Sequence, residues 1–205
     1  ENNSGSTNWK RVSNFYGREN SFSVIVNTTF YGTDAGNAPI AIYGKGVTDT
    51  EAYIISCTVA GNKSSSPDVC SGIAQIESKV KVYNSIVSGN KGGHDGIWAV
   101  KSSMNEIIDQ RTETVSYSIN AEKVFGDDDV MSGLLFDPEK MLGKASNGVV
   151  PLIGSGNPAL TNGMTADQLK SIKSGREPEI DETEVVKDQK GNPRTGKVMG
   201  AYVGE

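Results

Sequence analysis

The stretch that decides the fold is residues 53–62, which read YIISCTVAGN. Two other stretches superimpose on it: VIVNTTFYG at residues 24–32 and KVYNSIVSGN at residues 81–90. When the copies are aligned on the glycine near the end of each, they are spaced by 29 and 28 residues. A weaker fourth copy, VSYSI at residues 115–119, follows 33 residues further along. A recurring interval of this length indicates a repeat protein.

Each copy reads as two short strands joined by a tight corner. The corner residues Asn27, Ser56 and Asn84 share one register, where stacked polar side chains can hydrogen-bond along a ladder. The Gly-Asn pairs at residues 61–62 and 89–90 suit the turn that leaves the second strand, because Gly and Asn tolerate positive φ.

A third strand per repeat is predicted between the copies, from PIAIYG at residues 39–44 and GIAQI at residues 72–76. Three short strands per repeat indicate a stacked coil in which each strand pairs in parallel with its equivalent about 4.8 Å away. The predicted fold class is therefore all-β, a parallel β-helix of about four to five turns over residues 1–125. A β-sandwich has a turn spacing of about 8 to 12 residues, and a leucine-rich repeat needs leucine, which is absent before Leu134.

Alternation along the strands sends successive side chains to opposite faces of a sheet. The predicted interior column is Ile25, Ile54 and Val82, and the predicted outward column is Val24, Tyr53 and Lys81. The outward column offers stacked side chains to an extended partner.

Composition and charge exclude several classes of partner. The formal net charge is −5, and no basic cluster is longer than Lys10-Arg11, which disfavours binding to nucleic acid or to an anionic membrane. No run approaches the roughly 18 apolar residues of a membrane span, so no transmembrane segment is predicted.

The cysteines and the histidine limit metal chemistry. With Cys57, Cys70 and His94 as the whole set, the common zinc ligand combinations are excluded. The two cysteines form a disulfide around residues 64–67 (SSSP), or else Cys57 is a buried free thiol on a strand; the sequence leaves both open.

The repeat phrase resembles a known superfamily. NTTFYG at residues 27–32 and YNSIVSGN at residues 83–90 are similar to the recurrent phrase of pectate-lyase-like right-handed β-helix proteins. The resemblance implies a right-handed coil and a secreted or cell-surface location.

The C-terminal third, residues 126–205, is predicted to be an irregular, partly helical cap on the same solenoid, giving one domain overall. Residues 165–168 (TADQ) form a capping box that predicts a helix starting after Thr165. Residues 177–184 carry five acids and are typical of a solvated loop. An open solenoid end exposes strand edges, so a closing lid is expected there.

The end of the chain carries a second resemblance. GNPALTNG at residues 156–163, DQKGNPR at residues 188–194 and GAY at residues 200–202 resemble the ending of bacterial β-helix proteins called choice-of-anchor Q domain proteins. The chain departs from that ending at Asn157, where serine is usual, and in lacking the acids that flank GAY. In such an ending, Arg194 is expected to bond loop carbonyls or a carboxylate such as Asp188, and Tyr202 to plug the core. Because no N-terminal cap is evident before Val12, we expect the chain to be the C-terminal part of a longer protein.

Catalytic residues are not predicted. Lyases and glycosidases of the resembling superfamily need carboxylates and a base that converge on one outer sheet. The repeat strands carry almost no acids, and Lys79 and Lys81 have no obvious carboxylate partner. The favoured function is a non-catalytic secreted or cell-surface module in adhesion or glycan binding. The alternative is a polysaccharide lyase or glycoside hydrolase whose site lies in turns outside this chain.

Candidate ligand contacts come from outward or aromatic positions. The predicted ligand-binding residues are Tyr53, Lys81, His94, Asp95 and Trp98. A His-Asp pair beside an aromatic ring can orient a base or stack on a sugar. The acidic run of Asp127, Asp128 and Asp129 is a weaker calcium candidate, since it lacks the spacing and glycine of an EF-hand and also suits a solvated turn. No other cofactor is predicted.

Overall fold

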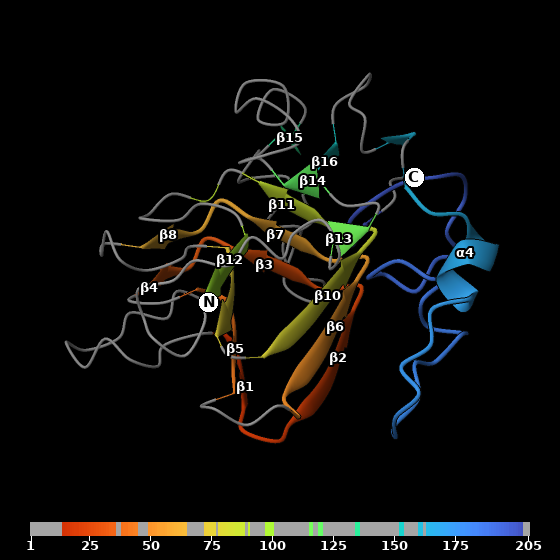
Figure 1. Cartoon of the computed structure of the whole chain (residues 1–205). Coiled ribbons are helices and arrows are strands. Elements are labelled where there is room, and N and C mark those ends of the chain that lie inside the picture. The colour runs from red at the N-terminus through yellow and green to blue at the C-terminus, as the bar shows by residue number, and fades with distance from the viewer. Residues whose placement is uncertain are drawn as a thin grey trace.

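The part of the protein that the computed structural model describes consists mostly of short β-strands with little helix (Figure 1). The residues described with their side chains are 14–34, 38–44, 49–63, 72–76, 78–87, 90, 160–161 and 163–202. Those described by backbone alone are 35, 64, 88, 97–100, 115–116, 119–120, 134–135 and 152–153.

Three parallel sheets of four strands each take one strand from each of four successive repeats. The first sheet contains β1 (Phe15–Arg18), β5 (Ile40–Tyr43), β9 (Ile73–Ile76) and β12 (Ile97–Val100). The second contains β2 (Phe22–Val26), β6 (Glu51–Ile55), β10 (Lys79–Tyr83) and β13 (Val115–Ser116). The third contains β3 (Thr29–Tyr31), β7 (Thr58–Ala60), β11 (Ile86–Ser88) and β14 (Ile119–Asn120). All the strand pairs in these sheets are parallel, as the repeat predicted.

Two small sheets complete the strand pairing. Strands β4 (Asp34–Ala35) and β8 (Lys63–Ser64) pair in parallel beside the third sheet's connections. Strands β15 (Leu134–Leu135) and β16 (Leu152–Ile153) pair antiparallel, in the part of the chain where the sequence loses its period.

The register of the second sheet confirms the predicted columns. Ile54 pairs with Ile25 on one side and with Val82 on the other. The fourth copy also keeps its predicted offset, since Val82 pairs with Val115 and Ile86 with Ile119. Successive repeats therefore place like residues next to one another.

The main apolar core lies between the three sheets and contains the predicted interior column. Its buried members are Ile25, Ile40, Ile42, Ala52, Ile54, Cys57, Val59, Ile73, Val80, Val82 and Val87. Full burial of an aliphatic side chain of this size stabilises the folded state by about 1.5–3 kcal/mol.

The corners between the second and third sheets adopt left-handed backbone conformations. Asn27, Ser56 and Asn84 have φ values of 51°, 53° and 50°. Asparagine tolerates this region better than most residues, which explains two of the three choices. The predicted ladder is confirmed between Asn84 Nδ2 and Ser56 Oγ, at 2.9 Å. Asn27 departs from it, because its Nδ2 donates to the carbonyl of Glu184.

A second ladder, which the sequence analysis did not predict, follows the third sheet. Asn62 Nδ2 donates to Asn90 Oδ1 at 2.8 Å, and Asn62 Oδ1 accepts the backbone N–H of Thr33 at 3.0 Å. These amides are buried and satisfy the backbone at successive turns.

Residues 163–202, which we name the C-terminal segment, lie along the outer face of the second sheet (Figure 1). Most of the first part of the predicted cap, residues 126–159, falls outside the described residues, so the lid over the solenoid end stays a prediction. The segment contributes a set of buried apolar side chains, Met164, Leu169, Ile172, Ile180 and Val185. They pack on Tyr53 and Ile55 and on the partly buried Phe22, Val24, Val26 and Tyr83. The outward face of the sheet is apolar and aromatic, so covering it removes a large apolar patch from water.

The helix predicted from the capping box is present as α4 (Ala166–Lys170). Thr165 Oγ1 accepts the backbone N–H of Gln168, and Gln168 Oε1 accepts the N–H of Thr165. The acids at residues 177–184 are exposed, as predicted, although Ile180 among them is buried. The predicted division of the chain after residue 125 falls outside the described residues.

Candidate functional site

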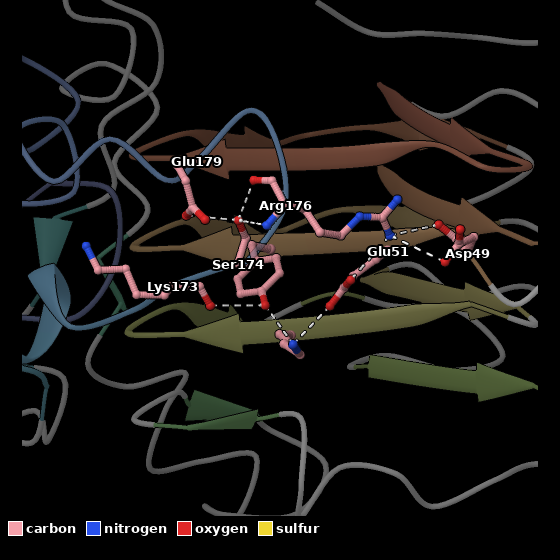
Figure 2. A network of polar contacts seen from close by, with 8 residues as sticks. Asp49, Glu51, Lys173, Ser174, Arg176 and Glu179 are labelled. Atoms are coloured by element: carbon pink, nitrogen blue, oxygen red, sulfur yellow. Dashed lines mark hydrogen bonds and ion pairs between the residues drawn. The ribbon is translucent and has the colours of Figure 1, made fainter.

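Charged side chains gather where the C-terminal segment crosses the second sheet. We name this group the Glu51 cluster and define it as Asp49, Glu51, Tyr53, Lys81 and Arg176; Figure 2 labels Asp49, Glu51 and Arg176. Lys81 Nζ lies 2.9 Å from Glu51 Oε1 and donates to Tyr53 Oη at 2.6 Å. The ammonium also lies 4.6 Å from the centre of the Tyr53 ring.

Arg176 joins this cluster from the C-terminal segment. Its Nη1 lies 3.5 Å from Glu51 Oε2 and donates to the carbonyl of Asp49 at 3.1 Å. The guanidinium carbon lies 5.1 Å from the centre of the Phe22 ring, within the range of a cation–π contact. The Glu51 carboxylate thus has one oxygen facing Lys81 and the other facing Arg176.

Strand register explains why Glu51 and Lys81 meet. Glu51 pairs with Lys79, and Tyr53 pairs with Lys81. Glu51 and Tyr53 are two residues apart on one strand and therefore lie on the same face. Lys81 is the diagonal neighbour of Glu51 across the ladder, within reach of a long side chain.

Mutual pairing favours the charged forms of Glu51 and Lys81. Burial by itself raises the pKa of the Glu51 carboxyl, but the bonds and charges of Lys81 and Arg176 outweigh it, so the pKa lies below its ordinary value. Burial by itself lowers the pKa of Lys81, yet its bonds to Tyr53 and Glu51 leave it raised. Burial raises the pKa of the neighbouring Tyr83 hydroxyl.

A second polar region, the corner seam, fixes the C-terminal segment to the left-handed corners. We define it as Asn27, Thr58, Asn84, Arg194 and Gly200. Asn84 Oδ1 accepts a hydrogen bond from the backbone N–H of Met164 at 2.9 Å. The main-chain carbonyl of Asn84 accepts one from the backbone N–H of Gly200 at 2.8 Å. Thr58 Oγ1 accepts the backbone N–H of Ala201 at 3.0 Å.

Arg194 holds the corner seam together. Its guanidinium donates to the carbonyls of Lys187, Val198 and Gly200 and to Asn27 Oδ1. The expectation that Arg194 bonds loop carbonyls is confirmed, whereas Asp188 instead accepts the backbone N–H groups of Lys190 and Asn192. Burial lowers the pKa of Arg194 to about 10, so the group remains cationic at neutral pH. Its charge is solvated by main-chain dipoles.

Tyr202 lies at this side of the second and third sheets rather than inside the main core. It is 6% exposed, and Lys190 Nζ lies 4.6 Å from the centre of its ring. The expected plug of the solenoid core is therefore replaced by a lateral contact.

Two of the predicted ligand-binding residues, Tyr53 and Lys81, are brought together. Tyr53 is only 1% exposed because the C-terminal segment covers it, so its ring is not on an open surface. The side chain of Lys81 is 36% exposed, and the expectation that it lacks a carboxylate partner is wrong. Trp98 lies on β12 of the first sheet, away from the strands that carry these two residues. His94 and Asp95 fall outside the described residues.

Cys57 is a free, buried thiol that donates to the carbonyls of Ile25 and Ile55. Of the two alternatives left open by the sequence, the structure has the buried free thiol; Cys70 lies outside the described residues. Within the described part of the chain, no group of three or more His, Cys, Asp or Glu side chains is placed to hold a metal ion. The calcium candidates Asp127, Asp128 and Asp129 lie beyond that part.

Comparison of the chain with protein-family models, with curated proteins and with solved structures finds no match. The site must therefore be interpreted from its own geometry. Among the residues that the structure describes, no helix has the length and apolar character needed to cross a bilayer.

Asp49, Glu51 and Arg176 are the members of the Glu51 cluster that the sequence analysis missed. Extending the repeat alignment two residues back from Tyr53 would have placed Glu51 on the outward face beside Lys81. Nothing local marks Arg176, because its partner lies 125 residues earlier in the chain.

Proposed function

We propose that the stacked repeats form a right-handed parallel β-helix and that the chain is a non-catalytic secreted or cell-surface module in adhesion or glycan binding. Four repeats that feed three parallel sheets in one register support the coil. Right-handed connections are the rule between parallel strands of one sheet. The likeness of the repeat phrase to pectate-lyase-like proteins, and of the ending to choice-of-anchor Q domain proteins, supports the location.

The proposal that the module is non-catalytic depends mainly on the pKa and the ion pairs of Glu51. It is the single acidic residue on the strands of the three sheets as described. A general acid for glycoside cleavage needs a raised pKa, and a lyase needs a free base. Glu51 has a lowered pKa, so it is not suited to be the general acid. Lys81 and Arg176 are paired with its carboxylate, so neither is a free base.

A glycan would bind away from the outer face of the second sheet, because the C-terminal segment occupies that face. We place the contact near Trp98 on β12, with His94 and Asp95 just before it in the sequence. An indole ring offers a flat apolar surface of the kind that stacks on a sugar.

A glycan array probed with the whole chain tests this function. We expect retention of an extended glycan, loss of that signal in Trp98→Ala, and no loss in the control Lys63→Ala, which changes an exposed side chain on β8. Assays for new reducing ends and unsaturated products should show no turnover of uronic-acid or neutral polysaccharides. An array without bound glycan contradicts glycan binding, and turnover by the wild-type chain identifies the lyase or hydrolase alternative. Protease accessibility on intact cells tests the proposed location.

A further inference from the structure

Glu51 connects three parts of the chain that are far apart in sequence. It belongs to β6, faces Lys81 of β10 through one oxygen and faces Arg176 of the C-terminal segment through the other. Arg176 also donates to the main-chain carbonyl of Asp49 at 3.1 Å, so residues 173–176 reach the sheet through one shared carboxylate and one carbonyl that does not titrate (Figure 2). A further contact, from Tyr53 Oη to the carbonyl of Lys173, is long at 3.3 Å.

Two aromatic rings contact this loop, Phe22 and Tyr53, and Tyr83 stacks on Tyr53; we name these three rings the aromatic row. Phe22 and Tyr53 meet edge to face with centroids 5.9 Å apart. Tyr53 and Tyr83 are stacked at 6.2 Å. The arginine that contacts Glu51 also lies over Phe22, so movement of the loop would uncover the Phe22 end of the row and the Tyr53 hydroxyl.

We propose that Glu51 is an acid-sensitive latch: it holds residues 173–176 closed over the aromatic row, and its protonation opens this loop while the three sheets stay folded.

The charges around Glu51 explain the direction of the change. Lys79 and Lys81 face it from β10, and Arg176 faces it from the C-terminal segment, while Tyr53 accepts a hydrogen bond from Lys81. Once the carboxylate is neutral, these cations lose the anion between them and repel one another. The Asp49 carboxylate cannot take the place of Glu51, because the Asp49 side chain is 75% exposed and its Oδ1 lies 3.8 Å from Arg176 Nη1.

The rest of the C-terminal segment is held by contacts that acid does not remove. Leu169 and Val185 are fully buried against the second sheet. In the corner seam, Arg194 donates to main-chain carbonyls and to the Asn27 amide, none of which titrates. Opening is therefore confined to the loop that depends on a carboxylate.

The sign of the pH dependence follows from Glu51. Its pKa in the folded chain is lowered, so its ion pairs are fully formed above the ordinary value of 4.5 and are lost as the pH falls through the lowered value. The latch is thus closed at neutral pH and opens only in acid.

Hydroxyl-radical labelling of the whole chain between pH 7 and pH 3 tests the latch, with the exposed Pro193 as the reference for labelling yield. In the wild type we expect labelling of Tyr53 to rise several-fold in acid while Tyr202, buried in the same segment, stays protected. Glu51→Gln should label at Tyr53 at pH 7 as strongly as the acidified wild type and should show no further rise. The matched control Glu182→Gln, which removes only the exposed Lys173–Glu182 pair, should behave as the wild type.

Arg176→Gln provides a second route to the open loop without leaving Glu51 unpaired, since Lys81 remains beside it. We expect Tyr53 labelling at pH 7 to rise in this variant too, with Tyr202 protected. Protection of Tyr53 in both variants at pH 7 overturns the latch. Simultaneous exposure of Tyr53 and Tyr202 in acidified wild type also overturns it, because that result means general unfolding.

Discussion

Gly200 lies where the C-terminal segment closely approaches β7 and β11. It has a φ of +87°, and a Cβ atom placed on it would lie 2.7 Å from Thr58 Oγ1 and 2.8 Å from Ile86 Cδ1. Glycine is thus required here twice, for the backbone conformation and for the close approach. The same residue donates its N–H to Asn84, so any shift that relieves the clash also disturbs the corner seam.

Replacing Gly200 by alanine should therefore lower the free energy of unfolding by more than the cost of a left-handed alanine, which is about 1–3 kcal/mol. Urea denaturation followed by circular dichroism measures it. Gly196→Ala is the matched control, because its φ is +72° but no atom lies within 4 Å of the added Cβ. Equal losses in the two variants would show that the close approach to Thr58 and Ile86 has no energetic weight.

At the scale of elements, helix α4 is too short to be stable alone and depends on the sheet beneath it. Leu169 is its buried residue and is fully shielded in the cluster with Tyr53 and Ile55. The side chain that stabilises the helix therefore also attaches the C-terminal segment to β6.

Leu169→Ala should cost about 2–5 kcal/mol of unfolding free energy, the usual range for a leucine truncated in a packed core. Because the segment and the sheet share this cluster, the loss should appear as one shifted transition in both circular dichroism and tyrosine fluorescence. Lys170→Ala, at the next and exposed position, should leave the midpoint nearly unchanged. A separate early transition in L169A, with the strands unaffected, would contradict a shared cooperative unit.

Strand order and register were predictable because the repeat interval and the two-residue alternation together fix which residues pair. Ile25, Ile54 and Val82 occupy the column expected of them. The position of the C-terminal segment was not predictable. Leu169 and Tyr53 meet across more than a hundred residues, and such contacts depend on shape and polarity that no local pattern encodes. The outward column, predicted to face an extended partner, is covered by the chain's own C-terminal segment, and nothing in the repeat indicates this.

At the scale of the whole molecule, Cys57 belongs to a buried cluster whose side chains come from all three sheets. It lies in the main core, and its thiol donates to carbonyls of β2 and β6. Burial raises its pKa to about 12, so the reactive thiolate is scarce in the folded chain at pH 8. A reagent reaches Cys57 only when the sheets separate.

We therefore expect Cys57 in a Cys70→Ser chain to react with a thiol reagent about 10³-fold or more slowly than in the urea-unfolded chain, the factor set by ordinary domain stability. The reaction rate should rise with urea in parallel with the unfolding equilibrium measured by circular dichroism. Ile54→Val, a small truncation in the same core, should speed the reaction by about two- to tenfold, which corresponds to a destabilisation of about 0.5–1.5 kcal/mol. Fast labelling of Cys57 while the strand signal is intact would mean that the core opens locally, and that the three sheets do not unfold as a single unit.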